Sequence, residues 1–204
     1  MKPLILSLLT VFALNTAQAA ITEGVDYTVL SKPQAVSNPK SVEVIEFFGY
    51  FCPHCKDFDP LISKWATTLP KNTIFRKEHI VWQDNMEAAA RMFYVINQMG
   101  PARKGAVNTA AFNTMAARQD FNSADVRKNF ATSQKLDPVT LEKAYSSYAA
   151  ASYVTRSKKL TKDYNITGTP AIIVQGKYAV KANSFPEMLR VTDELIQKVS
   201  SDLK

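Results

Sequence analysis

The chain has 204 residues, 46% of them hydrophobic, and a formal net charge of +7. This length and composition are enough to bury a good core, so one domain, or one domain with an insertion, is expected. The charge is modest and comes with no nucleic-acid motif and no aromatic–basic repeat, so no nucleic-acid partner is expected. A moderately basic surface favours solubility and contact with anionic surfaces.

Residues 1–19 have the pattern of a secretory signal peptide. Lys2 gives a positive start, Leu4 to Leu14 forms an apolar run, and Ala17-Gln18-Ala19 fits the small-x-small cleavage pattern. The apolar run is too short to span a bilayer, which needs about 20 residues, and an uncleaved anchor is the alternative interpretation. We therefore expect a mature protein outside the cytosol, where disulfides persist.

Two strands and one helix are predicted in the first part of the mature chain. Val25 to Leu30 alternates weakly and indicates an edge strand, whereas Val42 to Phe48 predicts the first strong strand. A helix should begin at the following cysteine motif, because Pro53 suits a first helical turn, and should end at Pro70. The residues at helical spacing that predict its buried face are Phe58, Leu61, Ile62, Trp65 and Leu69.

The middle of the chain is predicted to be helical. A strand over Thr73 to Val81 comes first, and apolar residues then recur at helical spacing over residues 83–160. The expected helices are Asn85 to Met99, Lys104 to Arg118, Ser123 to Ser133, and Asp137 to about Tyr164 with a bend near Ser146-Ser147.

Strand signals return near the C-terminus. Ala171 to Val174 and Tyr178 to Val180 predict a hairpin around the turn Gln175-Gly176-Lys177. Ser184 and Glu187 have the spacing of a capping box that opens a last helix. Its predicted buried face consists of Met188, Leu189, Leu195, Ile196 and Val199. The order of elements predicts an α/β sheet with an all-helical insertion.

The two cysteines of the chain stand in the motif Cys52-Pro53-His54-Cys55. A disulfide that closes so short a loop stabilises weakly, so thiol–disulfide exchange explains the pair better than a structural disulfide does. A zinc site is the other alternative. Besides the cysteines the chain has His54 and His79 alone, which are fewer well-spaced ligands than a structural zinc site takes. We expect neither a metal nor a cofactor.

The motif places Cys52 at the N-terminus of the predicted helix, where free N–H groups and the helix dipole stabilise a thiolate. His54 adds positive charge or a hydrogen-bond donor. We therefore expect Cys52 to be an exposed nucleophile with a lowered pKa, and Cys55 to be the buried resolving thiol. The reduced form should be more stable than the disulfide form at neutral pH, and the difference should shrink in acid.

Glu46 is a carboxylate in the first strong strand. Alternation places it on one face with Val42, Val44 and Phe48, and we expect that face to point inward. A buried carboxylate is costly unless it is paired, so its position indicates a functional site. The alternative is an ordinary exposed strand residue.

These residues resemble the bacterial periplasmic DsbA family of thiol:disulfide oxidoreductases, within the thioredoxin superfamily. The resemblance covers essentially the whole mature chain and rests on Glu46-Phe47-Phe48, Phe51 to Cys55, Lys77 with His79, and Gly168 to Ala171. It implies an α/β, thioredoxin-like fold with an inserted all-helical domain. The expected parts are a signal peptide over 1–19, a thioredoxin-like domain over 20–82 plus 161–204, and a helical insertion over 83–160.

The resemblance also implies an activity and partners. The protein would be a monomeric periplasmic enzyme that donates disulfides to unfolded or reduced exported proteins. A quinone-linked, DsbB-like membrane protein would then reoxidise it.

Roles for single residues follow from the same resemblance. Lys77 matches the usual partner of the acidic residue beneath the active site, and Glu46 would relay protons for Cys55. Thr169-Pro170 matches the family's cis-proline loop, whose backbone would pair with an extended substrate segment beside the thiols. The alternative is a proline that merely starts a strand. His79 is left outside the site, because a lone strand histidine is usually structural.

Other functions stay open at this point. An isomerase usually carries a separate dimerisation domain, a reductase is disfavoured by the Pro-His pair between the cysteines, and a substrate-dedicated oxidase fits the basic charge. A chaperone-like peptide-binding protein is the alternative from a different class, and its activity would survive mutation of both cysteines.

Overall fold

The computed structural model describes residues 20–203, so the expected signal peptide lies outside the described residues. The strands are β1 (Tyr27–Val29), β2 (Val42–Phe48), β3 (Thr73–His79), β4 (Ala171–Val174) and β5 (Tyr178–Val180). The helices are α1 (Pro53–Ala66), α2 (Glu87–Asn97), α3 (Pro101–Ala116), α4 (Ala124–Ser133), α5 (Pro138–Tyr145), α6 (Tyr148–Asp163) and α7 (Phe185–Asp202), with a 3₁₀ turn at Asp84–Met86.

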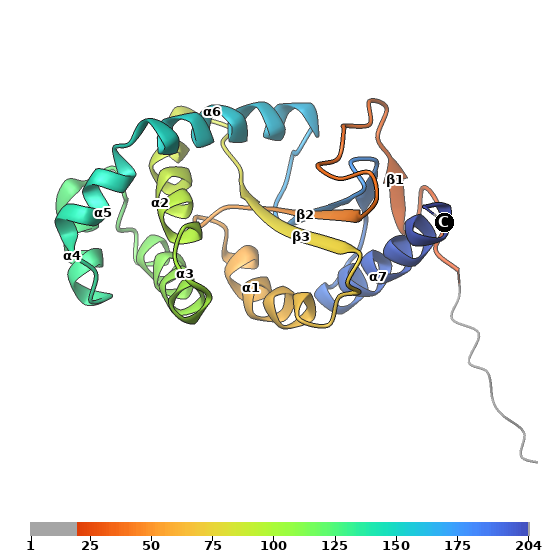
Figure 1. The fold of residues 1–204 in the computed structure, drawn as a ribbon, viewed down its shortest axis with the longest axis horizontal. Helices are drawn as coiled ribbons and strands as arrows, with labels where there is room; N and C mark the ends of the chain where they lie inside the picture. The colour runs from red at the N-terminus through yellow and green to blue at the C-terminus, as the bar shows by residue number, and fades with distance from the viewer. Residues whose placement is uncertain (1–19, 204) are drawn as a thin grey trace, which may run out of the picture.

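Within this part of the chain the strands form one five-stranded sheet in the order β1-β5-β4-β2-β3. Helices α1 and α7 cover one face and α6 crosses the other, while α2 to α5 gather beyond one end of the sheet (Figure 1). This is the expected α/β architecture with a helical block between β3 and β4. None of the helices in residues 20–203 has the length and apolar character that crossing a membrane requires.

Strand β2 is central, and every one of its residues is buried. It pairs in parallel with β3, from Val42 opposite Thr73 to Phe48 opposite His79, and antiparallel with β4. A parallel pair needs a crossover connection, which α1 provides. Because side chains alternate along a strand, the face that carries Val44 packs with α1 and α7, and the opposite face carries Ile45.

The predicted buried face of α1 was wrong at one position. Leu61 is 45% exposed, whereas Asp59 exposes 7% of its surface. The buried positions begin at Cys55 and continue through Phe58 to Trp65, so they follow a stripe one position away from Leu61. The helix also ends at Ala66, before the predicted Pro70. Asp59 therefore lies on the buried side of α1 with Phe58 and Ile62, and Leu61 lies on the exposed side.

The helical block follows the predicted order with shifted boundaries. Helix α3 begins at Pro101 and not near Lys104, because proline has no N–H to leave unpaired at a first helical position. The predicted bend is the junction between α5 and α6, where the Ser147 hydroxyl accepts a hydrogen bond from the Ala150 N–H. Helix α6 runs to Asp163, past the expected boundary at residue 160, and the division into domains stays a prediction.

The core of the helical block reaches the end of β2. Phe48 and Tyr50 belong to the same hydrophobic cluster as residues of α2 and α3. The ring of Phe48 lies 5.0 Å from Phe93 and that of Tyr50 lies 4.9 Å from Phe112, both edge to face. The loop that leads to the cysteines is therefore packed between the sheet and the inserted helices.

The C-terminal hairpin and helix confirm the predictions. Gly176 sits in the turn with φ +61, and a Cβ there would lie 2.2 Å from the Gln34 carbonyl oxygen, so the turn requires glycine. The Ser184 hydroxyl caps α7 by accepting from the Glu187 N–H at 3.3 Å. Helix α7 buries Leu195, Ile196 and Val199 as predicted, with Met188 and Leu189 partly buried.

Candidate active site

The cysteine motif lies where β2 passes into α1. Cys52 is the N-cap of α1 with extended backbone angles, and Pro53 is the first helical residue. The Cys52 sulfur accepts a hydrogen bond from the Cys55 N–H at 3.2 Å. A cap sulfur in this position receives the free N–H groups of the first turn and the positive end of the helix dipole. Local sequence thus places one sulfur where a negative charge is stabilised.

The two thiols have opposite acidities. Hydrogen bonding from the Cys55 thiol is the largest influence on Cys52 and, with smaller contributions from the Thr169 side chain and His54, lowers its pKa to about 6. The same bond to Cys52, together with burial, raises the pKa of Cys55. Both cysteines are free thiols in this structure. At neutral pH the pair therefore consists of a Cys52 thiolate and a protonated Cys55.

The expected exposure of Cys52 was wrong. Its exposed fraction is 8%, against 0% for Cys55, so the nucleophile is only slightly accessible. The loop before β4 accounts for this, because the Cys52 sulfur contacts the Thr169 carbonyl oxygen at 3.4 Å.

The Thr169-Pro170 segment lies beside the cysteines, as predicted, and its peptide bond is cis. The following residue, Ala171, begins β4 and pairs with Phe47 of β2, which brings the loop to the end of β2. Thr169 and Pro170 are both partly exposed. Pro53 and His54 are exposed on the other side of Cys52. The predicted motif and loop residues thus surround one sulfur.

Beneath the cysteines lies a charged cluster that contains two of the predicted residues. Glu46 is 1% exposed on the face of β2 that packs against α1, and Lys77 is its partner in the parallel pair. The Lys77 Nζ lies 3.1 Å from Glu46 Oε2 and 2.6 Å from Asp59 Oδ1. One cation is therefore shared by two carboxylates from different elements.

Burial and pairing oppose each other in this cluster. Burial raises the pKa of Glu46, and the nearby Lys77 reduces this shift without cancelling it. For Lys77 burial acts downward, but the charges of Glu46 and Asp59 outweigh it and its pKa is raised. The charge of a Cys52 thiolate also acts on Glu46 in the upward direction. A charge on Cys52 and a charge on Glu46 therefore disfavour each other.

Sequence reasoning missed three residues of this cluster. Asp59 bonds Lys77, the Asn108 side-chain amide donates to both oxygens of Asp59 at 3.1 Å, and the Tyr50 hydroxyl donates to Asn108 at 2.7 Å. The available signal was the spacing of Asp59, four residues after Cys55 on one helix face. Asn108 lies on α3, and no local pattern connects it to the motif.

His79 also touches the active-site loop. Its Nε2 accepts a hydrogen bond from the Tyr50 N–H at 3.1 Å, so the proton lies on Nδ1, which donates to the Ile80 carbonyl at 2.9 Å. Burial lowers the pKa of this fully enclosed imidazole to about 3. His79 therefore stays neutral and holds the backbone two residues before Cys52.

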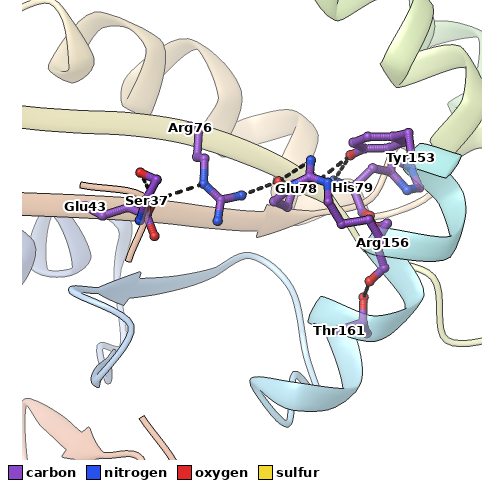
Figure 2. A network of polar contacts seen from close by, with 9 residues as sticks. Ser37, Glu43, Arg76, Glu78, His79, Tyr153, Arg156 and Thr161 are labelled. Atoms are coloured by element: carbon purple, nitrogen blue, oxygen red, sulfur yellow. Dashed lines mark hydrogen bonds and ion pairs between the residues drawn. The ribbon is translucent and has the colours of Figure 1, made fainter. Parts of the chain in front are cut away.

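Figure 2 shows the polar contacts that continue from His79 along β3 and α6. The His79 N–H donates to the Tyr153 hydroxyl at 3.1 Å, and that hydroxyl donates to Glu78 at 3.2 Å. Glu78 pairs with Arg76 on its own strand and with Arg156 of α6 at 2.9 Å. These contacts fasten α6 to the outer edge of the sheet, opposite the charged cluster.

Comparisons with known proteins agree with this geometry. A family model described as a DSBA-like thioredoxin domain matches residues 43–191. The chain is 34% identical over 190 residues to the thiol:disulfide interchange protein DsbA of Burkholderia cepacia, covering 91% of this chain and 89% of that one.

Solved structures give the same result. Reduced DsbA1 from Neisseria meningitidis has a TM-score of 0.83 at 32% identity, covering 91% of this chain and 98% of that one. The oxidoreductase NmDsbA3 from Neisseria meningitidis has a TM-score of 0.78 at 38% identity, covering 89% and 98%. The protein is a thiol:disulfide oxidoreductase, and its chain belongs to the family of DSBA-like thioredoxin-domain proteins.

Proposed function

We propose that the protein is a periplasmic oxidase that donates its Cys52–Cys55 disulfide to reduced or unfolded exported proteins. The observation that carries this proposal is the place of Cys52 at the N-cap of α1, where its sulfur accepts the Cys55 N–H at 3.2 Å; this agrees with a pKa lowered to about 6 at Cys52 and raised at Cys55. A stabilised Cys52 thiolate favours the reduced enzyme, so the disulfide form accepts electrons readily. The signal-like residues 1–19 support a location in the periplasm.

In the proposed cycle a substrate thiolate attacks the Cys52 sulfur of the disulfide. The bond between Cys52 and Cys55 breaks, a mixed disulfide forms, and Cys55 leaves with the electron pair and takes up a proton. A second substrate thiolate then attacks the substrate sulfur of the mixed disulfide, and Cys52 leaves as a thiolate. The substrate loses two electrons and gains a disulfide, and the enzyme is reduced.

Glu46 is the proton carrier for Cys55 in this proposal. Cys55 has a raised pKa, so it needs a proton when it leaves and must lose one when it attacks. Burial raises the pKa of Glu46, which suits it to exchange a proton, and Lys77 restrains that rise. The Glu46–Lys77 pair thus exchanges protons with the buried Cys55 sulfur, while the N-terminus of α1 stabilises the negative charge on the Cys52 sulfur.

The Thr169-Pro170 loop is the proposed substrate-binding segment. It contacts Cys52 and continues into β4, so an extended peptide could add to its backbone as a further strand next to the reacting sulfur. Pro53 and His54 border the other side. A quinone-linked, DsbB-like membrane protein would take the electrons away, and the working unit would be a monomer.

The experiment measures reduction potential and oxidation of a reduced dithiol peptide, for the wild type and for Cys52→Ser. We expect an oxidising potential and rapid peptide oxidation that Cys52→Ser abolishes. A strongly reducing potential would contradict the oxidase. Peptide binding that persists unchanged in Cys52→Ser, without oxidation by the wild type, would favour a chaperone-like role.

A further inference from the structure

Asn108 connects the inserted helices to the charged cluster. Its side chain is buried, at 9% exposure, and its amide nitrogen and amide oxygen both make hydrogen bonds in the cluster. The amide nitrogen donates to Asp59 Oδ1 and Oδ2 at 3.1 Å each, and the amide oxygen accepts from the Tyr50 hydroxyl at 2.7 Å. Because one partner can only accept and the other donates, these contacts fix the orientation of the amide.

Asp59 and Glu46 compete for one cation. Lys77 lies closer to Asp59, at 2.6 Å, than to Glu46, at 3.1 Å. The Glu46 Oε2 atom is buried, and within residues 20–203 the cation that neutralises it is Lys77, at the longer distance of 3.1 Å. Any change in how Asp59 is held therefore alters how much of the Lys77 charge reaches Glu46.

We propose that Asn108 is a positioning residue that sets the division of the Lys77 charge between Asp59 and Glu46, and thereby the proton exchange of Cys55. The amide nitrogen of Asn108 donates to both oxygens of Asp59 from the side of α3, which leaves Lys77 within reach of Glu46. Tyr50 ties the same amide to the loop before Cys52. The inserted helices thus take part in the chemistry of the cysteines. This inference rests on the proposed role of Glu46 and deepens it.

The other charged side chains near the cluster are engaged elsewhere and do not take the place of Lys77 between Asp59 and Glu46. A cleft of about 510 Å³ opens beside it, lined by Asp59, Lys77 and Asn108 and also by Lys104 and Arg76. Lys104 contacts Asn97, and its pKa is lowered by burial and then by Lys77. Arg76 is engaged by Glu43 and Glu78 on the opposite face. Solvent reaches Asp59 and Lys77 through this cleft, so protons can enter the cluster there.

The test uses the purified reduced protein and oxidised glutathione. Cys52 first forms a mixed disulfide with glutathione. Cys55 then attacks Cys52, the bond to glutathione breaks, glutathione leaves as a thiolate, and the Cys55 proton passes to the base. The rate of this second step is measured by mass spectrometry of quenched samples, from about pH 5 to pH 9. The midpoint of this pH–rate profile reports the pKa of the base that receives the proton.

Two variants should move this midpoint in opposite directions. In Asn108→Ala, Asp59 loses the amide nitrogen that donates to both of its oxygens and draws Lys77 more strongly, so the midpoint should rise by about one pH unit and the rate below it should fall roughly tenfold. In Asp59→Asn the competitor is neutral, Lys77 serves Glu46 alone, and the midpoint should fall. Loss of packing alone would change the rate without opposite shifts. Asn113→Ala, an exposed change on the same helix, should match the wild type.

Midpoints that coincide with that of the wild type, or that shift in the same direction in both variants, would overturn the proposal. If Asn108→Ala does not fold, Tyr50→Phe replaces it, because this change removes only the hydroxyl that donates to Asn108. Tyr50→Phe should raise the midpoint by less than Asn108→Ala. An unshifted midpoint in Tyr50→Phe would likewise overturn the proposal. The glutathione reaction needs no protein substrate. Failure of the oxidase proposal would instead appear as a wild type that does not oxidise a reduced peptide.

Discussion

Cys52 and Cys55 differ in acidity although they stand in the same motif. Cys52 occupies the N-cap of α1 and accepts hydrogen bonds from the Cys55 N–H and the Cys55 thiol, while Cys55 is completely enclosed. The same hydrogen bond therefore stabilises one charge and opposes the other. The difference is a consequence of position on the helix, since both residues are identical in chemistry.

This asymmetry predicts a pH-dependent stability of the reduced protein. The pKa of Cys52 falls from the ordinary value of 9.0 to about 6 on folding. The resulting stabilisation is fully present above the unfolded thiol pKa and is lost as the pH falls through about 6. We expect the reduced form to melt above the oxidised form at pH 8, by about 2 to 4 kcal/mol in unfolding free energy, with most of this difference lost at pH 5.

Thermal unfolding of both redox forms across this pH range measures the difference. Cys52→Ser provides the control, because it keeps Cys55 and the helix but removes the titrating cap. Its stability should not show the same loss between pH 8 and pH 5. Equal melting of the reduced and oxidised wild type throughout the range would contradict the lowered pKa.

At the scale of elements, the edge strand β3 is held to α6 by polar contacts in place of an apolar layer. Tyr153 is central to them, since its hydroxyl accepts from the His79 backbone and donates to the buried Glu78 (Figure 2). Glu78 exposes 2% of its surface and depends on such partners. The contacts also satisfy the backbone of a strand that has no sheet neighbour on that side within the described residues.

Tyr153→Phe should therefore destabilise the protein. The ring can remain in place, but the His79 N–H loses its acceptor and Glu78 loses a donor, which should cost about 1 to 3 kcal/mol. Denaturant unfolding measures the loss. Tyr148→Phe makes the same chemical change at the start of α6, where the side chain is 89% exposed, and should leave stability within about 0.5 kcal/mol of wild type. Equal stability of the two variants would show that the hydroxyl contributes nothing.

Local patterns were enough to predict most elements. Strand β2, the helix start at Pro53, the hairpin at Gly176 and the cap at Ser184 each depend on residues within a few positions of one another. Fold class follows from their order. The cysteine motif followed from the number and spacing of the cysteines, whereas the Thr169-Pro170 loop was recognised through family resemblance, which periodicity alone does not supply.

The remainder depends on contacts between distant parts of the chain. Leu61 was predicted inside and Asp59 was not, because an isolated helix pattern places leucine in the core and aspartate outside it. The burial of Asp59 is compensated by Lys77 of β3 and Asn108 of α3, which both donate hydrogen bonds to its carboxylate. The coverage of Cys52 by Thr169 likewise joins residues 117 positions apart. The spacing of residues along the sequence does not predict such contacts between distant segments.

At the scale of the whole molecule, the cysteine loop is the place where the sheet and the inserted helices are joined. Tyr50 is fixed at two points, its N–H by His79 of β3 and its hydroxyl by Asn108 of α3. Its ring packs against Phe112 of the helical block. The active site is therefore formed by both parts of the molecule together, and the stability of their junction affects the position of Cys52.

His79 makes that junction sensitive to acid in both redox forms. Its pKa in the folded protein, about 3, lies below the ordinary 6.5. Between pH 6.5 and pH 3 the unfolded chain therefore binds a proton at this histidine that the native protein does not bind. Stability should then decrease as the pH falls from about 6.5 toward 3, by about 3 to 5 kcal/mol over the full interval. The oxidised form isolates this effect, because it has no Cys52 thiol to titrate.

Denaturant unfolding of the oxidised protein at pH 7 and pH 4 measures the slope. His79→Gln keeps an acceptor for the Tyr50 N–H but cannot titrate, so it should be less stable than wild type at pH 7 and lose less stability on acidification. His54→Gln removes the other histidine of the chain, which is exposed, and should retain the wild-type slope. An unchanged slope in His79→Gln would mean that acid destabilises the fold through the carboxylate clusters, because the two histidines would then both be excluded as its cause.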